Sequence, residues 1–274
     1  MSTAAGTVGA GKAPRGRTRT FTRKQRIIAT VINLAIFAAV WQIVATVADI
    51  PRIFLPKLSE ILQQYPEMIE EGIFFGNVWI SLRIYLIGMA VSIAIGVPLG
   101  LIVGGIKILD RILLPYLWVV YTTLLIILML LILLWVGIND RARVFLIVVS
   151  AVPAIVVIVM EGVKTVDPSL LRAARSFGAR RGVLFAKVIM PSTIPFIATG
   201  VKMGVSRGLI GLFVGELFTG QDGIGYIITL ASKVFNIPRV FAMLLMFVAF
   251  SVAMVGLAQY IERRLSVWRS SAAL

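Results

Sequence analysis

The chain has 274 residues, of which 59% are hydrophobic and only 14% are charged, and its mean hydropathy is +0.98. Soluble domains carry about 25% charged residues, so this composition excludes an ordinary soluble protein and indicates one that lies in a lipid bilayer. The net charge of +15 comes with no nucleic-acid-binding motif, and the absence of cysteine and histidine excludes disulfide chemistry and conventional zinc sites.

The first 26 residues are rich in Gly, Ala, Thr and Arg and contain no acidic residue, which is typical of a disordered basic tail. Residues 6–12 match the spelling of a phosphate-binding loop. Ala13, however, replaces the Ser or Thr that would hold magnesium, Pro14 obstructs the helix that should follow, and there is no room for a preceding strand. We therefore expect no nucleotide site and no metal site in this chain.

Six apolar segments have the length of a membrane span, which is about 20 residues. They cover residues 27–48, 78–105, 112–136, 144–160, 193–217 and 239–258. The first is longer than the core of a secretory signal, so we interpret it as a retained span and not as a cleaved leader. The pattern predicts an all-α polytopic membrane protein, with a transmembrane domain at 27–268 and a C-terminal tail at 269–274.

The segment between the first two spans, Asp49 to Asn77, is broken by three prolines and suggests short helices at 59–65 and 67–72. These would carry four acidic residues: Glu60, Glu67, Glu70 and Glu71. If the segment is external, this acidic ledge could receive a soluble binding protein, although a solvated connector is at least as good an interpretation.

Residues 219–225 are rich in glycine and permit a tight turn or a re-entrant bend.

Two spans carry ridges of small residues. The second has Gly88, Ser92, Gly96, Gly100 and Gly104, and the fifth has Gly200, Gly204, Gly208, Gly211 and Gly215. Because small residues let helix backbones approach closely in lipid, we expect these two helices to pack against each other, within one protomer or across a dimer.

Four charged residues fall inside predicted spans: Arg83, Lys202, Arg207 and Glu216. Each costs about 2.5–3.5 kcal/mol at mid-membrane on insertion scales, so such residues usually face a pathway or a bundle interior. Arg207 lies near mid-span and is our first candidate for a pathway cation; Arg83 and Lys202 could instead snorkel or serve structure. Tyr121, Thr122 and Thr123 interrupt an aliphatic run in the third span and are further pathway candidates, although their hydroxyls could bond to their own helix.

A thirty-residue basic loop, residues 161–190, separates the fourth and fifth spans and contains a well-marked helix. Asp167 suits the N-cap, Pro168 the first helical position, and Gly178 the C-terminal cap. Its apolar face consists of Leu170, Ala173, Ala174 and Phe177, beside Leu171, and its basic border consists of Arg172, Arg175, Arg180 and Arg181. This helix fits an apolar groove with an acidic rim on a partner, or alternatively a surface of anionic lipid.

Charge placement predicts the orientation. With a cytoplasmic N-terminus, the inside segments hold 18 Lys and Arg residues and the outside segments hold 6. This bias predicts that both termini and the loop at 161–190 are cytoplasmic, and it accounts for the net charge through topology and lipid attraction.

The run from Asp167 to Ala179, followed by Phe185, Val188 and Met190–Pro191, resembles the cytoplasmic loop of bacterial ATP-binding-cassette importer permeases. Further similarity lies in residues 200–211, 215–218 and 223–227. The resemblance covers about residues 75–268 and is strongest to permeases for nitrate, sulfonates and taurine. Arg172 stands where the family motif has glutamate, so a polar contact made by that glutamate is not expected here.

The resemblance implies the pore-forming permease of an ATP-driven importer, without catalytic residues of its own. It further implies a bacterial inner-membrane location, ATP and magnesium on separate ATPase subunits that grip residues 167–178, an extracytoplasmic solute-binding protein, and a second permease copy. Because three of the four intramembrane charges are cationic, we expect a small anion such as a sulfonate, nitrate or a carboxylate. A neutral or cationic heterocycle, a gradient-driven secondary transporter and a membrane scaffold protein remain as alternatives.

Overall fold

The computed structural model describes residues 23–47, 51, 53–123 and 125–265. Every regular element in these ranges is helical. The chain divides into two units, residues 1–49 and 50–274. The predicted tails at 1–26 and 269–274 therefore fall wholly or mostly outside the described residues, as does the segment that matches a phosphate-binding loop.

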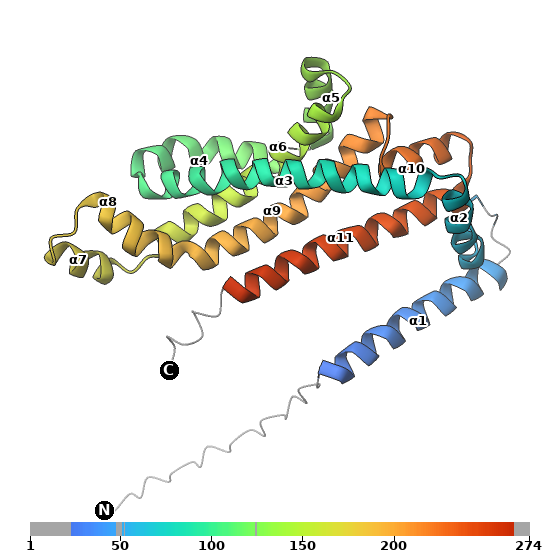
Figure 1. Cartoon of the computed structure of the whole chain (residues 1–274), viewed down its shortest axis with the longest axis horizontal. Helices are drawn as coiled ribbons and strands as arrows, with labels where there is room; N and C mark the ends of the chain where they lie inside the picture. Colours follow the sequence, from blue (N-terminus) through green and yellow to red (C-terminus); the bar gives the residue numbers. More distant parts are fainter. Residues whose placement is uncertain (1–22, 48–50, 52, 124, 266–274) are drawn as a thin grey trace, which may run out of the picture. The chain divides into compact units, whose positions relative to one another are not determined.

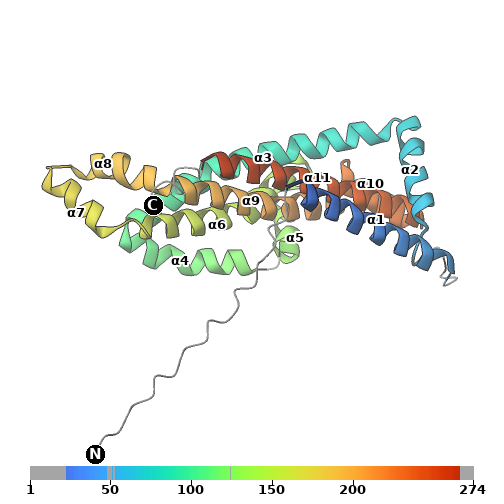
Figure 2. The same ribbon diagram turned by 90° about the horizontal axis from the view of Figure 1, so that it is seen from below.

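In the first unit the described element is α1 (Arg23–Val47), which contains the apolar stretch Ala35–Val47. The second unit begins with α2 (Leu58–Glu70), α3 (Ile73–Gly105), α4 (Lys107–Thr122), α5 (Leu125–Val136) and α6 (Asp140–Lys164). It continues with α7 (Pro168–Ser176), α8 (Arg181–Leu184), a π-helical turn (Phe185–Ile189), α9 (Met190–Thr219), α10 (Ile224–Lys233) and α11 (Ile237–Leu265). Within this unit α7 lies at one end of the long helices, and α2 and α10 lie at the other (Figures 1 and 2).

Four helices of the second unit are long and apolar enough to cross a membrane: α3, α6, the helix that continues from Gly182 to Thr219, and α11. They confirm the second, fourth, fifth and sixth predicted spans, although the fourth was drawn too short. The third predicted span is not one straight helix. It consists of α4 and α5, which are inclined by 98° to each other, and α5 turns away from the direction of α4 in Figure 1.

α6 is the central packing partner of the second unit, because both α3 and α9 contact it along much of their length. The ridge of α3 faces α6: a Cβ added at Gly96 would lie 3.0 Å from the Ile155 side chain, and one at Gly100 would lie 2.7 Å from Val159. The ridge of α9 faces the same helix, since a Cβ at Gly204 would lie 2.6 Å from Ile155.

The expected close approach at the glycines is therefore present, and α3 and α9 do contact each other, but most of the ridge glycines face α6. The ridges of α3 and α9 receive branched side chains of α6 and do not chiefly receive each other. Gly208 is the exception on the α9 ridge, because a Cβ there would also meet Met89 of α3, at 2.8 Å. Close contact with an intervening helix satisfies the same physical need, since dispersion forces drive helix association in lipid.

α5 joins this core through a cluster of buried residues on three helices: Met129 and Ile132 of α5, Ala142 and Leu146 of α6, and Val214 of α9. The corner between α5 and α6 is held by Asn139, whose side chain caps α6 by accepting a hydrogen bond from the Ala142 N–H at 3.0 Å. The position of α5 is thus fixed by packing at its sides and not by continuity with α4.

The predicted external segment differs in detail from the structure. One helix, α2, replaces the two short helices that were expected, because Pro66 lies inside it without ending it. α2 packs on α11, where the Tyr65 hydroxyl donates to the Ala242 carbonyl at 2.8 Å and burial raises the pKa of Tyr65. Glu71 pairs with Arg239 at 2.7 Å, so part of the acidic ledge is neutralised within the chain.

Substitution of Gly100 by Ala should lower the thermal stability of the purified protein, because the new Cβ would lie 2.7 Å from Val159 and 3.0 Å from the Val156 carbonyl oxygen. Such overpacking costs about 1–3 kcal/mol. The matched control is Gly76→Ala in the same helix, where a Cβ meets nothing within 4 Å and the higher helix propensity of Ala should slightly stabilise the protein. Equal melting temperatures for both variants in detergent would contradict the packing described here.

Candidate functional site

The short helix α7 has the ends that its sequence predicts. The Asp167 carboxylate accepts a hydrogen bond from the Ser169 N–H at 2.7 Å, and this bond lowers the pKa of Asp167. At the other end Gly178 has a φ of +76°, its N–H donates to the Arg175 carbonyl at 2.9 Å, and the Ala179 N–H donates to the Ala174 carbonyl at 3.1 Å. This pair of bonds is a Schellman motif, and it ends the helix cleanly.

α7 exposes its apolar face. No residue of the helix is buried, Phe177 directly after it is 92% exposed, and Leu170 is 52% exposed. Arg172 and Arg175 are exposed on the same helix, which gives an apolar strip with a basic border. The predicted loop was drawn too long, because α6 continues to Lys164 and the helix leading into α9 already begins at residues 181–182.

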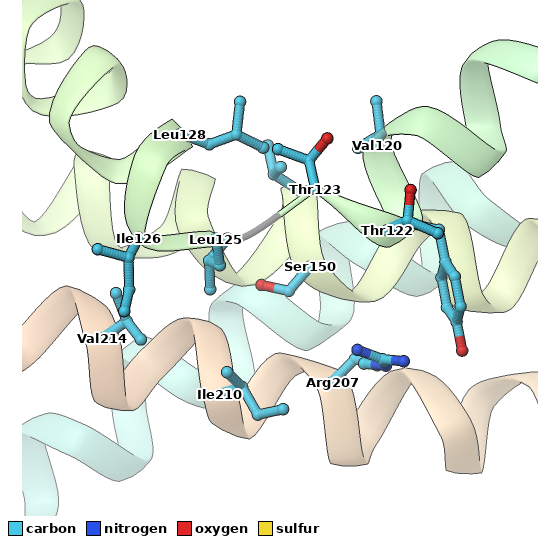
Figure 3. Close-up of a pocket in the computed structure, with 12 residues that line it drawn as sticks. Val120, Thr122, Thr123, Leu125, Ile126, Leu128, Ser150, Arg207, Ile210 and Val214 are labelled. Atoms are coloured by element: carbon cyan, nitrogen blue, oxygen red, sulfur yellow. The ribbon is translucent and has the colours of Figure 1, made fainter.

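A cavity of about 290 Å³ lies at the break between α4 and α5 and extends to α6 and α9. Its lining brings together residues that are far apart in sequence: Val120, Tyr121, Thr122, Thr123, Leu125, Ile126, Leu128, Val149, Ser150, Arg207, Ile210 and Val214. Figure 3 shows Arg207 and Ile210 on α9 pointing toward Ser150 and the α4–α5 break. Four of the seven predicted pathway candidates thus meet at one cavity: Tyr121, Thr122, Thr123 and Arg207.

Arg207 is the charged member of this lining. Its guanidinium carbon lies 4.4 Å from the centroid of the Tyr121 ring, which is the geometry of a cation–π contact. Within the part of the chain that the structure describes, no carboxylate forms an ion pair with Arg207.

Three hydroxyl groups of the cavity donate to carbonyls of their own helices. Thr122 donates to the Trp118 carbonyl at 2.8 Å and Thr123 to the Val119 carbonyl at 2.6 Å, and Ser150 donates to the Leu146 carbonyl. The two threonine bonds satisfy carbonyls at the end of α4, and Thr123 itself has extended backbone angles. The extended backbone of Thr123 marks the break that sequence analysis did not foresee.

The other two intramembrane cations are paired and lie outside the cavity lining. Lys202 forms an ion pair with Glu262 of α11 at 2.7 Å, and Thr199 donates to the same carboxylate at 2.9 Å. Arg83 forms an ion pair with Asp140 at 3.2 Å, with both side chains about half exposed. Of the three intramembrane cations from which an anionic substrate was expected, Arg207 is therefore the one that still supports that expectation.

Glu216 does not line the cavity either; it is fully buried beneath the start of α10. Its carboxylate accepts hydrogen bonds from the Ser81 hydroxyl and from the Gly225 N–H, the latter at 2.8 Å. Ser81 and Asn77 in turn accept from the N–H groups of Ile224 and Gly223 at 2.9 and 2.7 Å. Three backbone N–H groups at the α10 N-terminus, which have no partner within that helix, are thus bonded by side chains of α3 and α9. The hydrogen bonds of Glu216 therefore indicate a structural role.

Sequence analysis missed Arg143, which it assigned to an external connection and which is fully buried. Arg143 pairs with Asp222 in the turn before α10, donates to the Asp222 carbonyl at 3.2 Å, and lies 3.0 Å from Asp140. The expected tight turn at 219–225 is present, with positive φ at Gly220 and Gly223. The i, i+3 spacing of Asp140 and Arg143 at the start of an apolar helix could have predicted their ion pair from the sequence.

Comparison with known proteins gives a family match. Residues 96–267 match the model of the binding-protein-dependent transport system inner membrane component family. A probable ABC transporter permease protein of Brucella abortus is 29% identical over 80% of this chain and 88% of its own length. The putative aliphatic sulfonates transport permease protein of Bacillus subtilis is 27% identical over 86% of each chain, and the formylaminopyrimidine transport permease protein of Halalkalibacterium halodurans is 26% identical over 90% of this chain and 98% of its own.

Among solved structures, a chain of the MetNI methionine ABC transporter in an inward-facing conformation has the same fold. It matches with a TM-score of 0.62 and 17% sequence identity, over 72% of this chain and 97% of its own length.

Substitution of Glu216 by Ala should lower the stability of the protein by about 2–3 kcal/mol, because the buried Gly225 N–H and the Ser81 hydroxyl lose their acceptor. Glu216→Gln should cost less, since an amide oxygen can still accept from Gly225. Thermal unfolding in detergent measures both, with the exposed Glu161→Ala as a control expected to change little. A Glu216→Ala variant as stable as the parent would overturn the structural assignment.

Proposed function

The chain belongs to the family of inner membrane components of binding-protein-dependent transport systems, and from this premise we propose how it works as the permease subunit of an ATP-driven importer. A permease of this kind provides the route through the membrane and hydrolyses nothing itself. The energy then has to come from ATP, bound with magnesium on separate cytoplasmic ATPase subunits, and it has to enter this chain through a contact surface.

The exposed helix α7 is that surface, and its exposure is the observation that carries the proposal. An apolar strip that ends in an aromatic side chain 92% exposed to solvent is costly to leave in water, and a basic border of Arg172 and Arg175 favours a partner groove with an acidic rim. The stable caps at Asp167 and Gly178 keep the helix formed before the partner arrives, which lowers the entropy cost of binding.

Transport then follows from a population shift. The ATP-bound partners must bind one access state of the permease more tightly than the other, because equal affinity for both states would change nothing. A helix that continues from Gly182 to Thr219 connects the end of the α7 loop with Arg207 and the α10 turn. Force applied at α7 is therefore delivered along the helix that lines the cavity.

At the opposite end of the second unit, the turn between α10 and α11 is where we place the docking of the extracytoplasmic solute-binding protein. Phe235 has a φ of +54°, which is unusual for a residue with a side chain, and its ring is 72% exposed. It borders an open cavity that also includes Glu60 and Gln63 of α2. An exposed aromatic beside polar side chains is a typical anchor for a protein partner.

We further propose that two copies of this chain form one pore in a bacterial inner membrane. Supporting this, many large apolar side chains of α4 and α5 are exposed, including Tyr116, Ile127, Leu134 and Trp135. A second copy and lipid together would cover them.

The proposed substrate is a small anion, supported by the unpaired Arg207 and by the sulfonate relative.

Two other functions make different demands. A heterocycle importer, suggested by the formylaminopyrimidine relative, would need no cation in its pathway. A gradient-driven transporter would leave the exposed face of α7 without a partner.

Substitution of Phe177 or Leu170 by Asp should abolish co-purification of the ATPase with the tagged permease in mild detergent, because each puts a charge on the apolar face. The control is Ser169→Asp, which adds the same charge to an exposed polar position at the favourable N-terminal end of α7 and should leave the complex intact. Mass spectrometry and ATPase assays provide the readout. If neither apolar-face variant loses the ATPase, α7 is not the docking surface.

Native mass spectrometry of the intact complex should show two permease chains of 29.9 kDa with two ATPase subunits. A complex with one permease copy, or with a different second permease, would contradict the homodimer.

A further inference from the structure

We propose that the cavity around Arg207 is a transit site for a small organic anion with a short aliphatic tail, and that the Arg207 guanidinium binds its anionic group. This assignment rests on the proposed transport function but concerns a different part of the molecule from α7. It names the residue that selects the charge of the substrate and the side chains that accept the rest of it.

The charge of Arg207 requires compensation that this chain does not supply. A cation at mid-span is costly, and proteins normally neutralise it with a nearby carboxylate. The chain does so elsewhere: Lys202 has Glu262 at 2.7 Å, Arg83 has Asp140 at 3.2 Å, and Arg143 has Asp222 and Asp140. Among the described residues Arg207 has an aromatic ring in place of an acid, and no acidic residue lines the cavity.

The contact with Tyr121 also orients the guanidinium. With its carbon 4.4 Å from the ring centroid, the group is held at one face by the aromatic quadrupole, while its N–H groups remain available at its edge. A guanidinium edge presents two parallel donors, which match two oxygens of a sulfonate or carboxylate. The stacking therefore prepares Arg207 for an oxyanion without neutralising it.

The remaining walls specify the rest of the ligand. The hydroxyls of Thr122, Thr123 and Ser150 already donate to backbone carbonyls, which leaves the Arg207 guanidinium as the charged donor of the site, beside the hydroxyl of Tyr121. The wall beyond it is aliphatic, formed by Leu125, Ile126, Ile210 and Val214. Figure 3 shows these side chains gathered on one side of Ser150 and Arg207. An inorganic anion would leave this wall uncovered, whereas an alkyl tail would fill it.

Charge-selective thiol labelling tests the site directly, because the parent chain contains no cysteine. The Thr123→Cys variant in lipid nanodiscs is treated with anionic sulfonatoethyl methanethiosulfonate and, separately, with cationic trimethylammonioethyl methanethiosulfonate. The ratio of the two rates cancels any effect of Arg207 on the thiol pKa. Adding Arg207→Gln should lower the anionic-to-cationic ratio about tenfold, as expected for a unit charge a few ångströms away in a partly hydrated site.

Two further variants sharpen the result. Arg207→Lys should restore most of the ratio, because the charge is kept although the stacked plane is lost. The exposed Ser59 of α2 provides the matched control, Ser59→Cys, and its ratio should not respond to Arg207→Gln. An unlabelled Thr123→Cys variant, or a ratio unaffected by Arg207→Gln, would overturn the proposal.

Protection of the cysteine from labelling by added anions distinguishes a site for an organic anion from a site that recognises negative charge only. Butanesulfonate should slow labelling of Thr123→Cys by the anionic reagent more than an equal concentration of nitrate does. Equal slowing by both anions would overturn the assignment of the aliphatic wall to a substrate tail. The measurement needs no ATPase and no binding protein, so failure of the α7 experiments would leave its outcome unaffected, and the reverse also holds.

Discussion

Close packing around α6 is the constraint on which the rest of the second unit depends. Lipid offers apolar helices no hydrophobic reason to associate, so their contact has to come from dispersion over closely approaching surfaces. The glycines of α3 and α9 provide the hollows, and branched side chains such as Ile155 and Val159 of α6 fill them. This arrangement fixes the separation of α3, α6 and α9, and thereby fixes the positions of Arg207, Ser150 and Glu216.

The buried polar and charged side chains differ in whether they find a hydrogen-bond or ion-pair partner within the chain. Glu216 and Arg143 are fully buried and are used to hold the α10 turn against α3, α6 and α9. Lys202 ties α9 to α11. With these residues engaged in structure, Arg207 is the one of the four predicted and buried cations Arg83, Lys202, Arg143 and Arg207 that the described fold leaves without a carboxylate, and it faces the open space at the break between α4 and α5.

The sequence predicted best those features that depend on near neighbours. The α7 caps depend on Asp167, Pro168 and Gly178 within one short segment, and they were correct to the residue. The predicted contact between α3 and α9 exists, but the main partner of both glycine ridges, α6, was missed. A run of small residues reveals a hollow but not which helix fills it, and Ile155 on α6 looks like any lipid-facing residue. The α4–α5 break was also missed, since a threonine hydroxyl bonded to its own helix is compatible with a straight span. Ion pairs such as Lys202–Glu262 join residues sixty positions apart, and no local pattern announces them.

The π-helical turn at Phe185–Ile189 gives the connection between α7 and α9 a mechanical character of its own. A π turn closes its hydrogen bonds over one residue more than an α turn, so conversion between the two changes the length and twist of the helix. A change from π to α over these five residues would therefore rotate α7 relative to α9 as well as shift it along the helix axis.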